Sequence, residues 1–169
     1  ATMRWGKLTD GQSRRIRDFA PLATVDQRVV GAWDPIADKA YEASIKAGVL
    51  DRHDEIEPVS DFLKSIKPMP AVFDQEYVKR IDGVNVKNAP TKLQLVEARR
   101  KYIRRVKTEN DCDRLVMIWC ASTEKFITES EIHQDIESLL GGFQDNSENI
   151  APSMIYAYAA LLEGVPFAN

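Results

Sequence analysis

Apolar residues along the chain fall into two kinds of segment that follow one another in turn. Short apolar runs rich in strand-forming residues occupy positions 27–35, 71–73 and 115–120. Longer segments carry apolar residues near helical spacing, over positions 36–50, 55–70, 91–110, 128–143 and 151–164. Strands that alternate with helices of about ten to twenty residues are typical of a parallel sheet flanked by helices, so the pattern predicts an α/β fold.

Residues typical of helix ends set the expected boundaries. We expect helix starts at Asp34 (an N-cap before Pro35), at a Thr128–Glu131 capping box and at Pro152. We expect stops at Gly48, before Pro68 and Pro70, at Gly141–Gly142 and at Gly164. The clearest helix, 91–110, has one basic face and an apolar stripe, which consists of Leu93, Val96, Tyr102, Ile103 and Val106.

The first 26 residues have weak periodicity and a turn signal at Asp10–Gly11. We predict an N-terminal linker over 1–26, with an extended segment followed by a short basic helix or loop. A single domain is expected over 27–169. No period of about twenty to fifty residues repeats, which excludes a solenoid.

Composition narrows the function classes. The 169 residues are 44% hydrophobic and 29% charged, with a net charge of −3. A chain of this length buries about 70% of its unfolded surface, so it needs no metal or disulfide for stability. The lack of a net positive charge argues against a nucleic-acid partner. Two local basic clusters, Arg14–Arg17 and Arg99–Arg105, are expected to be solvated helix faces rather than an anion patch.

The chain carries two cysteines, Cys112 and Cys120, with a predicted strand between them. This spacing suits neither a zinc site nor a disulfide framework, which points to a reducing cytoplasm. No apolar run approaches the roughly eighteen residues that a membrane helix needs, and the N-terminus is not a signal peptide. We therefore expect a soluble, cytoplasmic protein without a membrane partner.

Candidate binding residues lie where the predicted strands end, because ligands of open α/β sheets bind outside the carboxyl ends of the strands. Asp34 ends the first strand, where its carboxylate would accept hydrogen bonds from a ribose. The alternative, an ordinary N-cap, is favoured by spacing alone. The third strand ends in small side chains that would let a flat ring or sugar lie over the backbone, at Cys120, Ala121, Ser122 and Thr123. Ser122 and Thr123 are also ordinary turn residues, and spacing alone favours that reading.

Other motifs of catalysis are missing from the sequence. It contains no Gly-x-Gly-x-x-Gly loop, no Walker loop and no Gly-x-Ser-x-Gly elbow. His53 and His133 lie in charged helices and are expected to be exposed, and Cys120 fits a small buried hydrophobic residue better than a nucleophile. No Cys/His/Asp cluster has metal-ligand spacing. The residues alone predict two ligand-facing strand ends, without a complete active site and without a metal.

Three segments, "VVGAWDPIADKAYEASIKAGVL", "DRLVMIWCASTEKF" and "IAPSMIYAYAALLEGVPFAN", resemble myo-inositol-1-phosphate synthase (inositol-3-phosphate synthase) of the prokaryotic type in their order and separation. The resemblance runs from Val29 to Asn169. It implies a Rossmann-like, mostly parallel sheet that is incomplete here, because the family's first strand and Gly-rich loop would precede Ala1. The family's lysine-bearing catalytic segment would follow Asn169. We therefore expect a central fragment that is inactive alone, and we assign it no catalytic residue.

For the full-length enzyme, the resemblance implies conversion of glucose 6-phosphate to myo-inositol 1-phosphate with tightly bound NAD. NAD would oxidise C5 of the open-chain sugar, and the enolate at C6 would close onto C1 in an aldol step. The NADH would then return its hydride, so that the cofactor is not consumed. The family also implies a homotetramer.

The resemblance assigns cofactor contacts residue by residue. Asp34 matches the aspartate of the family's Gly-Gly-Trp-Asp segment. Positions 120–123 match a Thr-Ala-Asn-Thr segment, from which Cys120 and Ser122 depart. Ala71 replaces a serine after Pro-Leu-Pro, and Val72 beside it keeps a packing role. The expected NAD-binding residues are Asp34, Ala71, Val72, Cys120, Ala121, Ser122 and Thr123.

Two rival interpretations stay open. The chain would belong to a related NAD-dependent sugar-phosphate or polyol enzyme if the full gene lacks a lysine-rich C-terminal region. The departures at Cys120, Ser122 and Ala71 instead motivate a non-catalytic nucleotide-binding or assembly module.

Overall fold

A computed structural model describes residues 4–5, 14–24 and 26–169, which divide into two units, Ala1–Val30 and Gly31–Asn169. In the first unit, strands β1 (Arg4–Trp5) and β2 (Arg14–Arg15) pair antiparallel, and a 3-10 helix, η1 (Ile16–Asp18), follows. The turn predicted at Asp10–Gly11 lies outside the described residues.

Two parallel strand pairs form the sheet structure of the second unit. Strand β3 (Trp33–Asp34) pairs with β4 (Met69–Pro70), and β5 (Met117–Ile118) pairs with β6 (Phe167–Ala168). Strands β3, β4 and β5 are shorter than the runs predicted over 27–35, 71–73 and 115–120, and β6 is an additional strand that the hydrophobic pattern does not predict. The run predicted over 71–73 pairs two residues earlier, and Ala71 adds a single bridge to Val86. The predicted α/β class with parallel strands is confirmed.

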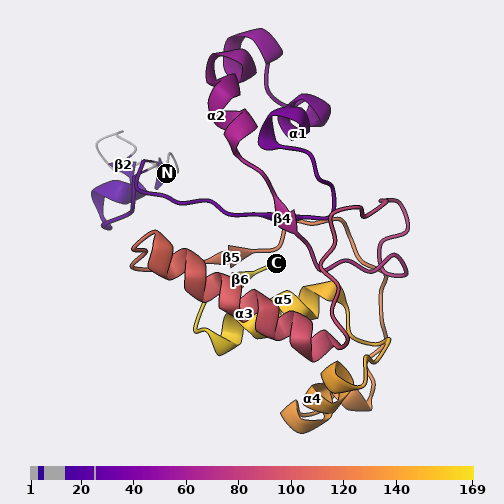
Figure 1. Cartoon of the computed structure of the whole chain (residues 1–169). Coiled ribbons are helices and arrows are strands. Elements are labelled where there is room, and N and C mark those ends of the chain that lie inside the picture. The colour runs from indigo at the N-terminus through magenta and orange to yellow at the C-terminus, as the bar shows by residue number, and fades with distance from the viewer. Residues whose placement is uncertain (1–3, 6–13, 25) are drawn as a thin grey trace. The chain divides into compact units, whose positions relative to one another are not determined.

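A helical excursion connects β3 to β4 (Figure 1). It contains α1 (Ala40–Ala47), a π-helical turn η2 (Arg52–Ile56), a 3-10 turn η3 (Glu57–Val59) and α2 (Ser60–Ser65). The stop expected at Gly48 is confirmed, since this residue ends α1 with φ of 62°. The N-cap expected at Asp34 is wrong. Its carboxylate accepts the Ile36 N–H at 2.8 Å in a local turn, and α1 begins only at Ala40.

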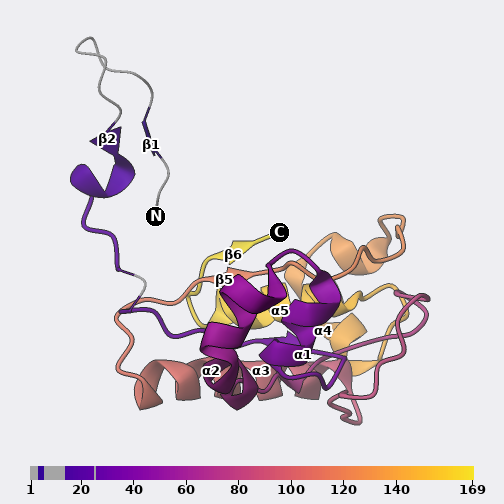
Figure 2. The ribbon, with the colours of Figure 1, turned by 90° about the horizontal axis from the view of Figure 1, so that it is seen from above.

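Two long helices carry the core. Helix α3 (Lys92–Glu109) lies along α5 (Pro152–Leu162), with the β5–β6 pair beyond α5 (Figures 1 and 2). Thr91 caps α3 by accepting the Gln94 N–H at 3.2 Å, and Pro152 occupies the first turn of α5 as expected. The helices bury Val96, Ile103, Ile155, Ala159 and Ala160 between them and the strands. The two small alanines, both fully buried, leave room for close packing.

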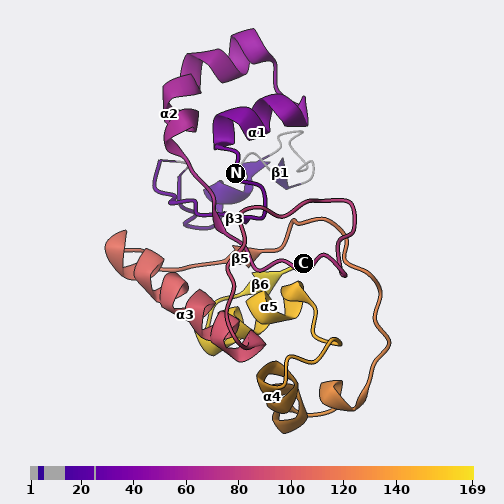
Figure 3. The same cartoon turned by 45° about the vertical axis from the view of Figure 1, so that its right-hand side comes forward.

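The region before α5 folds differently from the prediction. A 3-10 helix, η4 (Glu131–His133), comes first, and its capping box joins Ser130 and His133 rather than Thr128 and Glu131. Helix α4 (Ile136–Gln144) then starts at the Asp135 cap, which accepts the Ser138 N–H at 2.7 Å. Gly141 and Gly142 lie inside α4 and do not stop it. Figure 3 shows this helical pair on the opposite side of α5 from α1 and α2.

The basic cluster over 99–105 is only partly a solvated face. Arg99 is 4% exposed and buried against the strands, which corrects the prediction. Its neighbours Arg104 and Arg105 are exposed as expected. Among residues 4–5, 14–24 and 26–169, the structure has no helix of the length and apolarity that a bilayer crossing requires.

The C-terminal end of α5 forms a Schellman motif. The N–H of Val165 donates to the Ala160 carbonyl at 2.9 Å, and the N–H of Gly164 donates to the Leu161 carbonyl at 3.0 Å. Gly164 has φ of 65° there. The Gly164→Ala variant is therefore expected to lose about 1 kcal/mol of unfolding free energy in urea denaturation.

Gly141→Ala is the matched control for that substitution. Nothing lies within 4 Å of a Cβ placed on Gly141, and this glycine sits in the interior of α4. Its replacement is expected to stabilise the protein by up to about 1 kcal/mol through helix propensity. If both variants change the free energy of unfolding in the same direction, the left-handed backbone conformation of Gly164 is not the reason for its effect.

Candidate functional site

Tyr156 joins the ends of three strands. Its ring lies 5.3 Å from the ring of Trp33, the residue before Asp34, and 5.4 Å from that of Trp119, the residue before Cys120. Its hydroxyl accepts the Val72 N–H at 2.8 Å. One predicted ligand contact, Val72, and the residues that directly precede two others, Trp33 and Trp119, therefore converge on one buried side chain of α5.

Burial and a neighbouring cation set the chemistry of Tyr156. The side chain is 4% exposed, and this burial raises the pKa of its hydroxyl. The Arg99 guanidinium lies 5.9 Å from the Tyr156 ring centroid and donates to the Pro70 carbonyl at 2.9 Å. Burial lowers the pKa of Arg99. Tyr156 is thus a neutral hydrogen-bonding anchor at pH 7.

The end of β3 presents an open carboxylate. Asp34 is exposed, and one of its two oxygens accepts the Ile36 N–H. The other carboxylate oxygen makes no hydrogen bond within the described part of the chain. Asn85 braces this turn by donating its side-chain amide to the Asp34 carbonyl at 2.9 Å and its N–H to the Pro35 carbonyl at 2.8 Å. An ionised carboxylate held this way can accept hydrogen bonds from ligand hydroxyls.

The two residues after β4, Ala71 and Val72, are buried next to the candidate site. Ala71 and Val72 are 4% and 7% exposed, so their side chains lie beneath the surface. The Ala71 N–H donates to the Asn85 carbonyl, and its carbonyl accepts from the Lys87 N–H. With the Val72 N–H bound to Tyr156, this segment has little left to offer a ligand directly. Its role in this structure is to fix the neighbouring backbone.

The loop after β5 is open. Cys120, Ala121, Ser122 and Thr123 are all exposed, so the expectation that Cys120 is a small buried hydrophobic residue is wrong. The next residue, Glu124, pins this loop to the start of α5. Its two carboxylate oxygens accept the Ser153 N–H at 3.0 Å and the Ser153 hydroxyl at 2.5 Å. The first turn of α5 is therefore already satisfied by a protein carboxylate.

Removal of this carboxylate is expected to weaken α5. Glu124→Ala should lower the free energy of unfolding by about 1 kcal/mol, because it deletes the helix cap. Glu129→Ala is the matched control, since Glu129 is exposed and has no hydrogen bond in the described structure. Urea denaturation of both variants checks this, and equal effects would show that Glu124 does not act as a cap.

The histidines and cysteines do not form a second site. His53 is exposed as expected, but His133 is half-buried, with its ring accepting the Ser130 N–H at 2.9 Å and lying 3.0 Å from the Asn149 carbonyl. Cys112 and Cys120 are both free. In the part of the chain that the structure covers, no group of three or more His, Cys, Asp or Glu side chains is placed to hold a metal ion.

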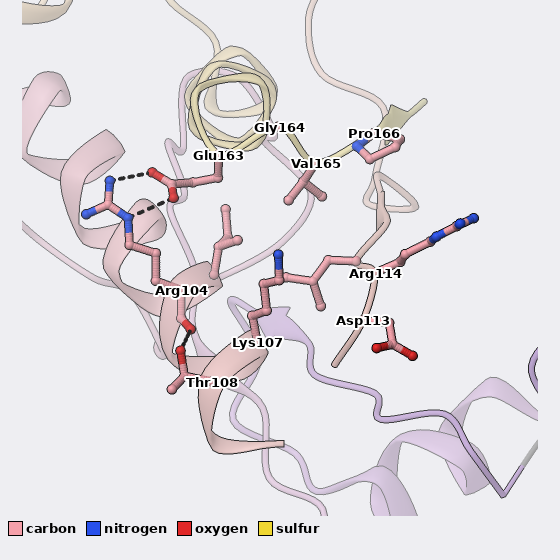
Figure 4. A pocket seen from close by; sticks show the side chains of 11 residues that line it. Arg104, Lys107, Thr108, Asp113, Arg114, Glu163, Gly164, Val165 and Pro166 are labelled. Carbon is pink, nitrogen blue, oxygen red and sulfur yellow. Dashed lines mark hydrogen bonds and ion pairs between the residues drawn. The ribbon is translucent and has the colours of Figure 1, made fainter. Parts of the chain in front are cut away.

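A hollow of about 500 Å³ lies at the opposite end of the sheet (Figure 4). Residues Asp113–Leu115 before β5 and Gly164–Pro166 before β6 line it, so it opens at the amino ends of these strands. Ligands of α/β sheets bind at the carboxyl ends, which argues against this hollow as the cofactor site. Its wall holds Glu163, which pairs with Arg104 and Arg100 at 2.7 Å.

The Glu163 pairs predict a pH-dependent contribution to stability. Hydrogen bonds from Arg104, and then from Arg100, hold the pKa of Glu163 below its ordinary value of 4.5. A carboxylate with a lowered folded-state pKa stabilises the protein above about 4.5 and loses this effect as the pH falls through the folded-state pKa. Glu163→Gln is therefore expected to lower the melting temperature at pH 7, by an amount that shrinks below pH 4.5.

Glu109→Gln serves as the control for Glu163→Gln. Glu109 is 3.6 Å from Arg105 in an exposed pair, and such pairs contribute little. In thermal melts between pH 3 and pH 7, the difference in melting temperature between wild type and variant should depend on pH for Glu163→Gln and not for Glu109→Gln. A difference for Glu163→Gln that does not change with pH would contradict the ion-pair explanation.

Some of these residues were not identified from the sequence. Tyr156, Asn85, Glu124 and Arg99 hold the strand ends in place, but nothing in their local sequence separates them from core or surface residues. Glu124 does follow the apolar run 115–120 by four residues, which places it in the loop at a predicted strand end. Among the predicted ligand contacts, Ala71 and Val72 are buried and their backbone groups are already hydrogen-bonded within the protein. Asp34 and residues 120–123 are exposed to solvent.

The residues present fit part of a dinucleotide site. Asp34 supplies a hydroxyl acceptor, and the exposed loop over 120–123 supplies a small-residue surface. A phosphate-binding helix start is not among the described elements near these strand ends, because the α5 start is taken by Glu124. The fit therefore covers the nucleoside-binding contacts rather than the pyrophosphate.

Comparison with known proteins bears on the same region. The family model of the NAD-binding domain described as myo-inositol-1-phosphate synthase matches residues 1–169. Inositol-3-phosphate synthase 1 of Bacteroides thetaiotaomicron is 43% identical over 168 residues, which are 99% of this chain and 38% of that protein. Inositol-3-phosphate synthase of Trypanosoma brucei brucei is 29% identical over 91% of this chain and 30% of that protein.

A solved structure shares the fold. The crystal structure of inositol-3-phosphate synthase from Caenorhabditis elegans superposes with a TM-score of 0.82 and 23% sequence identity, over 99% of this chain and 34% of that chain. The chain thus spans 30% to 38% of the length of these three relatives. Because the family model covers the chain from end to end, the chain belongs to the myo-inositol-1-phosphate synthase family and corresponds to its NAD-binding domain.

Proposed function

We propose that this chain is the NAD-binding part of an enzyme that converts glucose 6-phosphate to myo-inositol 1-phosphate. The observation that carries the proposal is the match of the family's NAD-binding model to all 169 residues. The packing of Trp33, Trp119 and the Val72 backbone against Tyr156 supports it, because each of these residues is an expected cofactor contact or directly precedes one.

Some of these residues contact the cofactor, and others fix the backbone of the contact residues. Asp34 accepts hydrogen bonds from the ribose hydroxyls, and the 120–123 loop lies against the nucleoside. Ala71 and Val72 pack beneath it, with Tyr156 and Asn85 fixing their backbone. When bound, NAD accepts a hydride from the substrate and returns it later in the cycle. No catalytic residue is assigned to this chain, and we expect no turnover by these 169 residues alone.

The wider assignment follows from the same family. The domain spans residues 27–169, after a linker over 1–26, and belongs to an isomerase of inositol and phospholipid biosynthesis. We assign the full-length enzyme to the cytoplasm as a homotetramer, with glucose 6-phosphate as its substrate and neither nucleic acid nor a membrane as a partner. The two free cysteines agree with a reducing compartment.

NAD binding and product formation by the full-length protein test the proposal. Titration calorimetry should show saturable NAD binding, and glucose 6-phosphate with NAD should yield inositol phosphate. Ala121→Glu places a carboxylate in the loop that is expected to meet the nucleoside, and it should weaken NAD binding by more than about tenfold, or 1.4 kcal/mol. Ala47→Glu in the exposed end of α1 is the control and should not change it.

Each outcome selects one interpretation. NAD binding without inositol phosphate formation would favour a related NAD-dependent sugar-phosphate enzyme. No NAD binding by the full-length protein would favour the non-catalytic assembly module that the departures at Cys120, Ser122 and Ala71 motivate. Equal loss of NAD affinity in Ala121→Glu and Ala47→Glu would remove the 120–123 loop from the site.

A further inference from the structure

A groove of about 390 Å³ lies between α3 and the β3–β4 pair. Its walls combine two aromatic residues, Trp33 and Tyr102, with four cationic ones: Lys87, Arg99, Lys101 and Arg105. The expected cofactor contacts, at Asp34, Ala71, Val72 and 120–123, do not line it. The groove is therefore distinct from the site described above, although it shares the same strand pair.

The groove is strongly positive in an acidic chain. Its lining contains four cationic side chains and no carboxylate, whereas the whole chain has a net charge of −3. The hollow at the other end of the sheet differs, because Asp113 and Glu163 accompany its cations. A concave surface lined by charges of one sign focuses the field and attracts ions of the opposite sign.

Only one of these four cations has a carboxylate partner among the described residues. Lys87 and Lys101 make no side-chain hydrogen bond or ion pair with any described residue, and Arg105 reaches only the exposed Glu109, at 3.6 Å. By contrast, Arg100 and Arg104 on the same helix pair with Glu163 at 2.7 Å. Helix α3 thus carries one face whose arginines share the mostly buried carboxylate of Glu163, and a groove-lining face whose only described carboxylate partner is the exposed Glu109.

Arg99 is the buried member of the set. It is 96% buried, its partner is the neutral Pro70 carbonyl, and its Nε has no hydrogen-bond partner among the described atoms. The guanidinium lies 5.6 Å from the Trp33 ring centroid, which offsets only part of the cost of burying a charge. A guanidinium remains charged at neutral pH, so its field acts in the groove without a counter-ion from the protein.

Helical spacing explains why the groove is open. Ala98, Lys101, Tyr102 and Arg105 follow one another at the i, i+3, i+4 and i+7 positions of one face of α3. The small Ala98 leaves space, while Lys101 and Arg105 are like charges one turn apart, which destabilises a helix unless an anion lies between them. Arg105 also covers the Tyr102 ring, at 4.8 Å from its centroid.

We propose that this groove binds a small phosphorylated anion that carries at least two negative charges. Arginine and lysine around a concave surface suit phosphate oxygens, with arginine able to donate two parallel hydrogen bonds. The volume suits a small molecule rather than a polymer. A free diphosphate and a nucleotide share this phosphate chemistry, and comparison of pyrophosphate with ADP distinguishes between them.

Titration calorimetry of the protein with inorganic pyrophosphate tests the proposal. We expect saturable one-to-one binding with a dissociation constant below about 1 mM at low ionic strength. The Lys101→Gln/Arg105→Gln double variant, which changes only exposed side chains, should weaken binding by at least about tenfold. Lys107→Gln removes one cation from the same helix outside the groove and should change the constant by less than about twofold.

Two further arms fix the ligand and the site. Tighter binding of ADP than of pyrophosphate would identify a nucleotide, and equal or weaker binding would identify a ligand recognised by phosphate alone. Any of three results would overturn the proposal. They are a titration that does not saturate, sulfate that competes as well as pyrophosphate itself, and an equal loss of pyrophosphate affinity in the Lys101→Gln/Arg105→Gln and Lys107→Gln variants. Ala121→Glu should weaken NAD binding and leave pyrophosphate binding in the groove unchanged. A wrong groove proposal can therefore be told apart from a wrong NAD-site proposal.

Discussion

Replacing Tyr156 with alanine is expected to lower the free energy of unfolding by about 4 kcal/mol. The ring is 96% buried and contacts both Trp33 and Trp119, so its loss leaves a cavity between the two strand pairs. It also leaves the buried Val72 N–H without its acceptor. Urea denaturation measures the effect, and the transition should remain cooperative because both strand pairs still pack on α3 and α5.

Tyr156→Phe separates the hydroxyl from the ring. This change keeps the aromatic packing but leaves the Val72 N–H unpaired, which should cost about 1–3 kcal/mol. Tyr158→Phe is the matched control, because Tyr158 lies two residues away on α5 and its hydroxyl makes no hydrogen bond in the described structure. A loss of stability in Tyr158→Phe as large as that in Tyr156→Phe would mean that the Val72 hydrogen bond contributes little.

The same variant bears on the site. Tyr156→Phe frees the backbone at Val72 without touching the exposed residues Asp34 and 120–123. If the proposed cofactor contacts depend on this anchor, NAD affinity of the full-length protein should fall in Tyr156→Phe and not in Tyr158→Phe. Unchanged affinity would confine Tyr156 to a role in stability.

The parts of the fold that sequence predicts well are those whose signals are local. The apolar stripe of α3, the Pro152 start of α5 and the Gly164 stop each lie within one helix, so helical spacing and cap chemistry identify them. The parallel strand order also follows from the alternation of strands with helices. These features need no knowledge of the partner segments.

The errors arise where a residue's environment is set by distant segments. An unbroken apolar run such as 115–120 is typical of a strand buried on both faces, yet Val116 and Ile118 are 64% and 65% exposed, because only one face of β5 packs on the helices. Gly141 and Gly142 look like a helix stop, but the fully buried Phe143 and the packing of α4 hold this helix through both glycines. Tertiary packing overrides the local signal in both cases.

The candidate site divides in the same way. Asp34 and residues 120–123 are predicted from the strand ends and from the family resemblance, whereas Ala71 and Val72 are predicted from the resemblance alone. Tyr156 was not predictable, because its partner Val72 lies 84 positions away in the sequence. Arg99 reads as one of several basic residues on a helix, and only the packing of α3 on β4 shows that it is buried.

Phe143→Ala is the second large effect that we expect, at about 3–5 kcal/mol of unfolding free energy. The side chain is fully buried, and its ring stacks on Tyr158 with a centroid separation of 5.1 Å. This contact joins α4 to α5, so the truncation removes a fully buried apolar contact between α4 and the core. Phe126→Ala makes the same chemical change at a side chain that is 92% exposed, and it should shift stability by less than about 0.5 kcal/mol.

Hydrogen exchange distinguishes two ways in which Phe143→Ala can act. If α4 unfolds with the rest of the second unit, amide protection should fall equally in α3, α4 and α5. If α4 is a separate, weaker unit, its amides should lose protection first while those of α3 and α5 keep theirs. We expect the first outcome, because Asn146 accepts the Lys92 N–H at 2.7 Å and donates to the Pro90 carbonyl at 2.8 Å, which ties the end of α4 to the start of α3.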